Sequence, residues 1–271
     1  MTNKTDKRPI LARLRVWFED YISRFVSDDS IFQENIDLKV GHTYRVCEAI
    51  LDIGESLNLD REELCLAETS ALLHDIGRFE QYRQYRTFSD YRSEDHAALG
   101  IKVIKTSSVL NGFEPAEAEI IIRVIGYHNR AALPVGEDER CLFFLKLLRD
   151  ADKIDIWHVV TDYYQSAGYK RNQTIELDLP DMDQISDSVY EALMKGELAQ
   201  MADLKTLNDF KSLQIGWIYD VNFPRTFQII MEKRYLEKIR EALPKKSVRA
   251  DEIYNKANAY LERNISSLFI T

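Results

Sequence analysis

Cysteine, glycine and proline are scarce in this sequence. It has three cysteines, ten glycines and six prolines among 271 residues, with 45% hydrophobic and 30% charged residues. Cys47, Cys65 and Cys141 form no CxxC pair and are odd in number. This pattern argues against a disulfide framework and favours reduced core residues in a cytoplasmic protein. The remaining composition is that of a globular protein without low-complexity segments or internal repeats.

The sequence has neither an excess of positive charge nor a long apolar run. Its formal net charge is −9, so no surplus of lysine and arginine is available to neutralise the phosphates of a nucleic acid. A general nucleic-acid binder is therefore excluded, but one small anionic substrate held by a local basic cluster is not. No apolar run approaches the length that spans a bilayer. Glu19 and Asp20 interrupt the only early apolar stretch, so we expect neither a membrane segment nor a secretory signal.

Apolar residues recur at helical spacing along most of the chain. The segment "LARLRVWFEDYISRF" carries four on one stripe: Leu14, Phe18, Ile22 and Phe25. The segment "REELCLAETSALLHDI" is expected to be a helix that Gly77 stops, and Ser93 is expected to cap the start of another. Pro115 fits the first turn of a helix, and a long helix is expected over residues 138–164. The sequence therefore predicts an all-α fold.

Two segments depart from this helical pattern. Residues 78–92, "RFEQYRQYRTFSDYR", are dense in Arg and Tyr and are expected to form a loop or irregular connection. The segment "TIELDLP" alternates with period two, which indicates a short extended piece that Pro180 ends.

Five histidines, few for a chain of this length, stand out by their placement. They are His42, His74, His96, His128 and His158. His74 lies on the buried stripe of its expected helix and is followed directly by Asp75, while Asp152 continues an apolar stripe of the long helix. An unpaired buried carboxylate is costly because it loses its hydration, and a divalent cation removes that cost. Imidazole and carboxylate ligands suit Mn, Fe, Zn, Ni or Mg, so we expect helices to bring these groups to one metal site.

Five motifs in order make the sequence resemble the HD domain superfamily of metal-dependent phosphohydrolases. They are "HTYRV", "LLHDIGRF", "EDHAALG", "GYHNR" and "RDADKIDI", within residues 38–165. The resemblance implies an HD-domain-like helical bundle over these residues. We expect residues 1–37 to pack on this core as an N-terminal helix, and residues 166–271 to be accessory helices in the same globular unit. These apolar C-terminal helices are candidates for a homodimer contact.

The resemblance also implies a set of metal ligands. Its residues for a first ion are His42, His74, Asp75 and Asp152. Asp150 competes with Asp152, but two residues on a helix differ by about 200° of rotation, so both cannot face one ion; the "AD-x-x-D" context favours Asp152. His96 and His128 match the added histidines of members that bind two metals, and Asp75 would then bridge the ions. His158 lies outside the pattern and is expected to be structural.

The implied activity is hydrolysis of a phosphate ester of a nucleotide or a small phosphorylated metabolite by a metal-activated water. Asp75 is then catalytic, and whichever of His96 and His128 does not bind metal could contact phosphate or act as a general acid. Arg78, Arg83, Arg86 and Lys153 are the candidate phosphate contacts, because arginine offers forked donors to phosphate. A solvated surface loop is the alternative for the arginines.

Two other functional classes fit the same residues. Some HD proteins with six ligands hold two irons and oxidise a substrate with O₂, and ligand count does not separate them from hydrolases. A non-enzymatic nucleotide sensor is the other class, although the ligand set is intact. Substrate identity, the physiological metal and the number of ions are not readable from the sequence.

Overall fold

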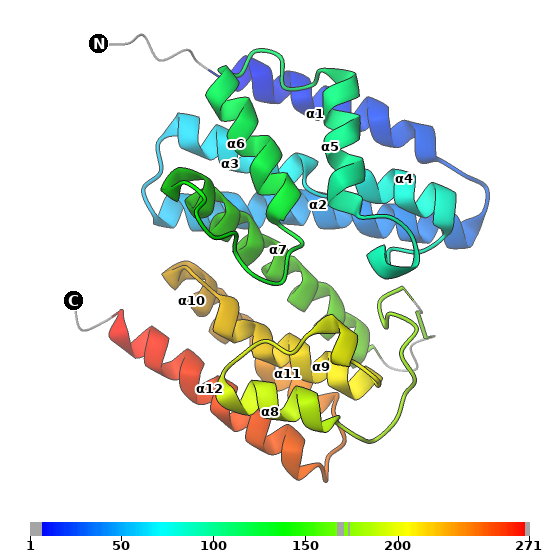
Figure 1. Cartoon of the computed structure of the whole chain (residues 1–271), viewed down its shortest axis with the longest axis vertical. Coiled ribbons are helices and arrows are strands. Elements are labelled where there is room, and N and C mark those ends of the chain that lie inside the picture. The colour runs from blue at the N-terminus through cyan, green and yellow to red at the C-terminus, as the bar shows by residue number, and fades with distance from the viewer. Residues whose placement is uncertain (1–6, 167–170, 173, 269–271) are drawn as a thin grey trace. The chain divides into compact units, whose positions relative to one another are not determined.

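The computed structural model describes residues 7–166, 171–172 and 174–268. These residues form α-helices, short 3-10 turns and connections, and no β-strand occurs among them (Figure 1). The all-α prediction is confirmed. None of the helices in the described part of the chain is long and apolar enough to cross a membrane.

The chain divides into two compact units, Met1–Asp152 and Lys153–Thr271. The division falls inside the long helix α7 (Glu139–Gln165), whereas we expected the core to extend to residue 165. That the C-terminal helices belong to the same globular unit as the core stays a prediction. So does a homodimer contact.

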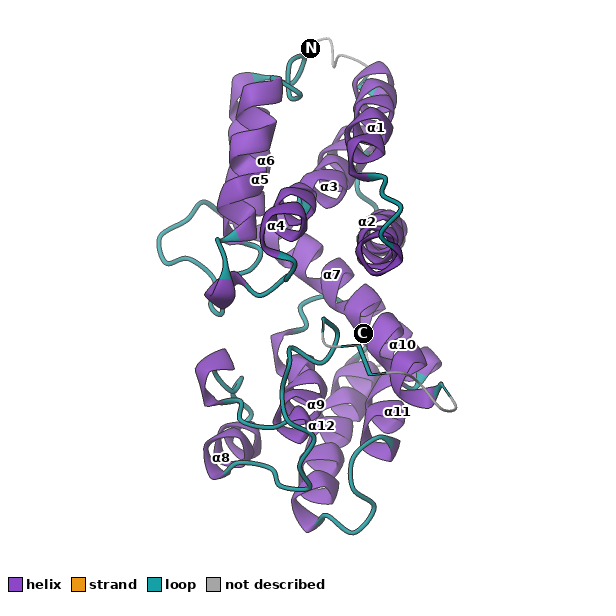
Figure 2. Ribbon diagram, turned by 90° about the vertical axis from the view of Figure 1, so that its right-hand side faces the viewer, coloured by secondary structure: helices purple, strands orange, loops and turns teal. Residues whose placement is uncertain are grey.

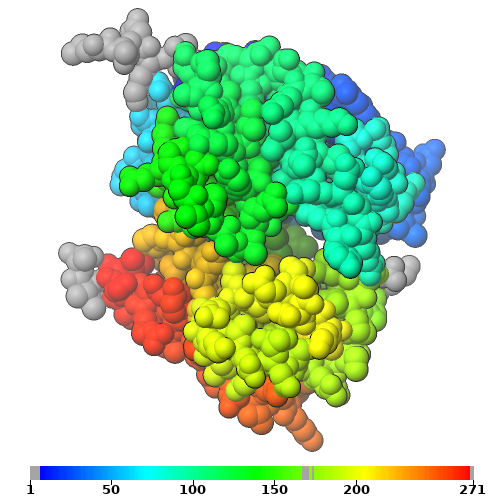
Figure 3. All heavy atoms as spheres, in the orientation of Figure 1, coloured from blue at the N-terminus to red at the C-terminus, as the bar shows by residue number. Residues whose placement is uncertain are grey.

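The described part of the first unit contains six α-helices, two short 3-10 helices and the start of α7. Their bounds are α1 (Arg8–Ile22), η1 (Ser23–Phe25), α2 (Ser30–Ser56), α3 (Arg61–Leu73), α4 (Ile76–Tyr85), η2 (Asp90–Arg92), α5 (His96–Ser107) and α6 (Pro115–Tyr127). Figure 2 shows α3 and α4 between α1 and α2 on one side and α5 and α6 on the other, and the contacts between these helices agree. In Figure 3 the side chains of α5 and α6 cover much of the visible face of this unit. Residues of α3 and α4 therefore lie in the middle of the unit.

Aromatic and aliphatic side chains fill the space between these layers. Leu14 and Phe18 of α1 are fully buried, and the Phe18 ring lies edge-on to those of Tyr44 and Phe79. The three cysteines are buried and unpaired, as expected. The N-terminal helix thus packs through the stripe that its sequence predicts, and Phe25 at the end of the stripe is buried, although Ile22 is only partly buried.

The junction between α3 and α4 is a break in an otherwise continuous helical path. Helix α3 ends at Leu73, His74 keeps helical angles, and Asp75 (φ −102°, ψ 14°) departs from them before α4 begins at Ile76. The prediction that Gly77 ends the helix is wrong, because Gly77 lies in the first turn of α4. A Cβ on Gly77 would stand 2.1 Å from the carbonyl oxygen of His96, so glycine is needed here for the close approach of α5.

Three further expectations are corrected. Residues 78–85 are helical rather than a loop, since α4 runs to Tyr85. The cap of α5 is Asp95 and not Ser93, because the Asp95 carboxylate accepts from the backbone N–H of Ala97 at 2.9 Å. The segment 174–180 forms turns rather than an extended piece. The expectations for Pro115, in the first turn of α6, and for the long helix α7 are confirmed.

The described part of the second unit is built from the end of α7, five later α-helices and two short 3-10 helices. They are α8 (Asp187–Lys195), η3 (Met201–Asp203), α9 (Leu207–Gly216), η4 (Trp217–Asp220), α10 (Pro224–Lys233), α11 (Tyr235–Glu241) and α12 (Val248–Ser267). Helix α9 is buried along its whole length. Trp157 of α7 is fully buried and donates to the Gln214 carbonyl of α9 at 2.8 Å, which ties α7 to the centre of this unit.

Candidate metal centre

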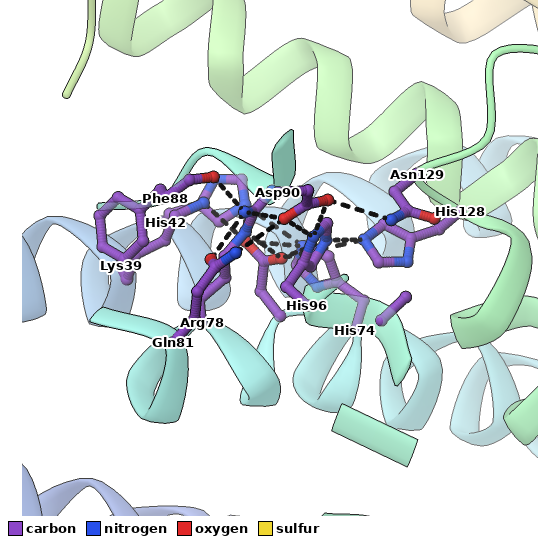
Figure 4. A network of polar contacts seen from close by, with 12 residues as sticks. Lys39, His42, His74, Arg78, Gln81, Phe88, Asp90, His96, His128 and Asn129 are labelled. Carbon is purple, nitrogen blue, oxygen red and sulfur yellow. Dashed lines mark hydrogen bonds and ion pairs between the residues drawn. The ribbon is translucent and has the colours of Figure 1, made fainter. Parts of the chain in front are cut away.

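Six histidine and aspartate side chains of the first unit lie close together. They come from α2, the α3–α4 junction, the start of α5, the end of α6 and α7: His42, His74, Asp75, His96, His128 and Asp152. Figure 4 shows the four histidine rings of this group with the polar residues around them. These are the six residues that the sequence resemblance implies as ligands.

A first set of these side chains surrounds one oxygen of Asp75. His42 Nε2 lies 3.2 Å from His74 Nε2 and 3.2 Å from Asp152 Oδ1. Asp75 Oδ2 lies 3.4 Å from His42 Nε2 and 3.6 Å from His74 Nε2. Two imidazole nitrogens and two carboxylate oxygens therefore face one small volume, which is the donor set that Zn, Mn, Fe or Ni prefers.

A second set faces the other oxygen of the same carboxylate. Asp75 Oδ1 lies 3.3 Å from His96 Nε2 and 3.8 Å from His128 Nε2, and these two nitrogens are 3.0 Å apart. Asp75 thus contributes one oxygen to each set. This arrangement is suited to a carboxylate that bridges two cations.

Hydrogen bonds on the far side of three rings determine which nitrogen is free to bind a cation. His74 Nδ1 donates to the Ala71 carbonyl at 2.7 Å, and His128 Nδ1 donates to the Ile125 carbonyl at 2.6 Å. His96 Nδ1 donates to Asp90 Oδ2 at 2.7 Å. With the Nδ1 protons assigned to these acceptors, each Nε2 carries a lone pair directed into the site.

This tautomer assignment makes a cation the natural occupant of the second set. The Nε2 atoms of His96 and His128 then present two lone pairs to each other at 3.0 Å, with no proton between them. Such an approach is repulsive unless a positive charge lies beside it. The residues present therefore fit a divalent metal.

Burial keeps the imidazoles of His74 and His96 neutral, which is the form that binds metal. Burial lowers the pKa of His74 to about 4, and burial together with the Arg78 charge lowers the pKa of His96 to about 4. Burial alone would raise the pKa of Asp75, but Lys39 and the surrounding histidines hold it well below its usual value. The carboxylate is therefore ionised at neutral pH.

The structure places Asp152, rather than Asp150, with the histidines. Asp152 Oδ1 lies 3.2 Å from His42 Nε2 and 3.8 Å from His74 Nε2. Asp150 is fully buried, and among the described residues it belongs to no group of candidate ligands. The ligand role of Asp152 stays a prediction that this geometry favours.

The candidate phosphate contacts have different surroundings. Arg78 lies beside the site, with Nε 3.4 Å from Asp75 Oδ1. Arg83 pairs with Glu80 and lies over the Phe25 ring. Arg86 pairs with Asp29 at 2.9 Å and lies over Phe32. The contacts of these two exposed arginines are thus with Glu80, Asp29 and two phenylalanine rings.

The fourth candidate phosphate contact, Lys153, and the fifth histidine, His158, belong to the second unit. Lys153 directly follows Asp152, is 8% exposed, and has its Nζ 2.6 Å from Asp220 Oδ2. His158 lies 3.4 Å from Asp162, one turn further along α7, and its structural role stays a prediction.

Sequence reasoning missed four polar residues around the site. They are Lys39, Gln81, Asp90 and Asn129. Lys39 Nζ donates to Asp75 Oδ2 at 2.6 Å. Its spacing was a usable signal, because Lys39 precedes His42 by three residues on α2 and so shares its face. Asp90 had no such signal, since it lies in an irregular connection where no period places it.

His96→Ala and His128→Ala are each expected to remove one ion and leave the other. Each change takes one nitrogen from the second set, while the first set keeps both of its histidines. Elemental analysis and calorimetric titration of metal-free protein with Mn²⁺ would measure this. Retention of two ions at unchanged affinity in both variants would exclude the histidines as ligands and leave them as substrate or acid–base groups.

Comparison with known proteins finds similarity to a family model, to a bacterial protein and to a solved structure. Residues 40–157 match the family model of the HD domain. The protein of Bacillus subtilis (strain 168) named "Putative phosphohydrolase YueE" is 32% identical over 117 residues, which are 42% of this chain and 60% of that protein. A crystal structure of a predicted HD superfamily hydrolase from an uncultured Thermotogales bacterium matches with a TM-score of 0.37 and 23% identity, over 63% of this chain and 81% of that one.

The family match begins two residues before His42 and ends five residues after Asp152. It therefore includes every one of the six clustered side chains. Residues 40–157 of this chain are thus similar to the HD domain over the whole stretch that carries the cluster, and the chain spans 60% of the length of its B. subtilis relative.

Proposed function

We propose that the protein is a metal-dependent phosphohydrolase that cleaves a phosphate ester of a nucleotide or a small phosphorylated metabolite. The observation that carries the proposal is the division of six histidine and aspartate side chains into two sets that share Asp75. The match of residues 40–157 to the HD domain model and the name of the B. subtilis relative support it. A bound divalent cation lowers the pKa of water towards neutrality and polarises a phosphoryl oxygen.

In the proposed reaction, water adds to phosphorus, the ester P–O bond breaks, and the leaving oxygen takes a proton. Asp75 would hold cations on both sides of its carboxylate and fix the distance between them. A histidine of the second set that is not engaged by a cation could accept at Nε2 the proton that the attacking water loses and pass it to the leaving oxygen, since this nitrogen faces the site. His42, His74 and Asp152 would hold the ion of the first set.

Positive charge beside Asp75 supports an anionic substrate in a chain of net charge −9. Lys39 and Arg78 both approach this carboxylate, at 2.6 and 3.4 Å. Lys39 is partly exposed and also lies 5.5 Å from the centre of the Phe88 ring. We assign Lys39 as a substrate-binding residue, because its ammonium becomes available to a phosphoryl oxygen once cations balance the Asp75 charge.

Lys39→Gln is accordingly expected to raise KM with both ions still bound. A charge-assisted hydrogen bond to phosphate contributes about 1.5–3 kcal/mol, which is roughly a 10- to 150-fold effect on kcat/KM. Lys39→Arg is the matched control and should keep most of the activity because it keeps the charge. Loss of a metal ion from Lys39→Gln, or kinetics equal to those of the unmodified protein, would contradict the assignment.

A substrate panel tests the proposed function. Metal-free protein would be reconstituted with Mn²⁺ or Ni²⁺ and assayed for phosphate release from nucleoside mono-, di- and triphosphates and sugar phosphates, and for release of linear products from cyclic dinucleotides. We expect release that requires the cation and is lost in Asp75→Ala. Tight nucleotide binding to the metal-loaded protein without turnover of any substrate would favour the sensor instead.

A further inference from the structure

The Asp90 carboxylate is the centre of a polar network beside the metal centre. Four side chains donate a hydrogen bond to it: His96 Nδ1 at 2.7 Å, Gln81 Nε2 at 2.8 Å, Arg78 Nη1 at 2.9 Å and Asn129 Nδ2 at 3.3 Å. Figure 4 shows the Asp90 carboxylate together with these four partners. Arg78 and Gln81 belong to α4, His96 belongs to the second metal set, and Asn129 adjoins that set. Asp90 itself is the first residue of η2, outside the helices that carry the ligands.

The bond from His96 determines how that ring presents itself to the site. Because Asp90 accepts from Nδ1, the proton is held on the side of the ring away from Asp75. Nε2 is then the atom that approaches Asp75 Oδ1 at 3.3 Å and His128 Nε2 at 3.0 Å. A carboxylate behind a ligating histidine fixes its tautomer and raises its basicity.

The hydrogen bond from Asn129 links Asp90 to His128, the other histidine of the second set. Asn129 directly follows His128, and its amide nitrogen donates to Asp90 and, at 3.0 Å, to Asp95 Oδ1. Asp95 is the cap of α5, whose first residue is His96. Asp90 and Asp95 thus connect the end of α6 to the start of α5, the two helix ends that carry the second set.

Helix α4 holds the carboxylate in place from the opposite side. Arg78 Nη1 also donates to Gln81 Oε1 at 2.9 Å and to the Phe88 carbonyl. Gln81 is fully buried and also donates to the Glu94 carbonyl at 2.8 Å. Arg78 supplies the opposite charge that an ionised, partly buried carboxylate needs. The network therefore fixes Asp90 independently of any cation.

We propose that Asp90 is a positioning residue for the second ion of the proposed dinuclear site, acting through His96 and, by way of Asn129, through His128. The inference rests on the proposed metal centre but not on its chemistry. It assigns Asp90 no contact with the substrate and none with the ion of the first set. Loss of Asp90 should therefore weaken one ion selectively.

Titration of metal-free protein with Mn²⁺ tests this selectivity. In Asp90→Ala we expect one ion to bind as in the unmodified protein and the affinity for the other to fall about 10- to 100-fold, the usual effect of removing such a partner. Asp90→Asn keeps the shape and one acceptor oxygen, so its loss should be smaller. It also keeps the test valid if the alanine variant does not fold.

Asp29→Ala is the matched control, because Asp29 also pairs with an arginine of the same segment, Arg86, at 2.9 Å. It removes a helix cap as well, since Asp29 accepts from the backbone N–H of Phe32. We expect Asp29→Ala to lower the melting temperature and leave both ions bound. If Asp29→Ala is destabilised but keeps both ions, a loss of stability alone does not explain the weaker binding of one ion in Asp90→Ala.

Imidazole ¹⁵N NMR of the metal-free protein measures the tautomer of His96. A purely structural role of Asp90 would leave this tautomer unchanged. His96 should show the Nδ1–H tautomer in the unmodified protein and in Asp29→Ala, and should lose that preference in Asp90→Ala. The proposal is overturned if both ions bind Asp90→Ala with unchanged affinity, if both are lost together, or if the unmodified protein binds a single ion. Two bound ions without phosphate release from any substrate would instead overturn the proposed function and leave the role of Asp90 standing.

Discussion

Asp75→Ala is expected to abolish both metal binding and hydrolysis. Asp75 is the one carboxylate whose two oxygens face both sets, with Oδ2 near His42 and Oδ1 near His96. Removal of one preorganised electrostatic group commonly lowers kcat by about 10²–10³, and this change acts on both ions, so we expect a loss of at least that size. Elemental analysis and phosphate release on the same sample would measure it.

Asp150→Asn is the matched comparison for this result. Asp150 is a fully buried aspartate of α7, and the isosteric amide keeps its shape. We expect this variant to retain substantial metal, whereas Asp152→Asn should lose the ion of the first set. A fully loaded Asp75→Ala protein, or a requirement for Asp150 in place of Asp152, would show that the carboxylate ligands are assigned wrongly.

Gly77→Ala is expected to cause the largest loss of stability of any single-methyl change in the first unit. The added Cβ would lie 2.1 Å from the His96 carbonyl oxygen and 2.5 Å from the Gly100 nitrogen, and both are backbone atoms. Helix α5 must then move away from α4 and take His96 with it. Overpacking costs about 1–3 kcal/mol where side chains can adjust, and here the backbone must move, so we expect about 3 kcal/mol or more.

Gly126→Ala is the control for the Gly77 variant, because Gly126 is also helical but its Cβ would meet only the end of the Ile101 side chain, at 3.1 Å. We expect a change within about 1 kcal/mol there, since alanine favours the helix over glycine by roughly that amount. Denaturant unfolding would compare the two variants. Equal stability of Gly77→Ala and the unmodified protein would refute the close-approach account of α4 and α5.

The helices that carry ligands were largely predictable from the sequence. Apolar spacing located α3 and α7, and Pro115 marked the start of α6; the same spacing located α1, which carries none of the six clustered side chains. The junction after α3 was not predictable in the same way. Gly77 was expected to end a helix because glycine commonly does so, but its role depends on the neighbouring α5, which is nineteen residues later in the chain at His96.

The six clustered side chains could be identified because each lies in a motif on a helix or at a helix end. Their partners could not, since hydrogen bonds such as those of Asp90 form between segments whose relative position the sequence does not encode locally. Arg78 illustrates the difference. Its charge and its place after the His74–Asp75 pair suggested a phosphate contact, whereas the structure shows its guanidinium donating to Gln81, Phe88 and Asp90. Its role towards substrate stays a prediction.

Phosphate release in ¹⁸O-labelled water, with oxygen excluded, tests the central proposal most directly. The same six ligands would also suit a di-iron oxygenase, so the source of the incorporated oxygen separates the two enzymes. We predict that the metal-loaded protein turns over a phosphate ester anaerobically and places one ¹⁸O from water in each phosphate released. Turnover that requires O₂, or product without oxygen from water, would contradict hydrolysis.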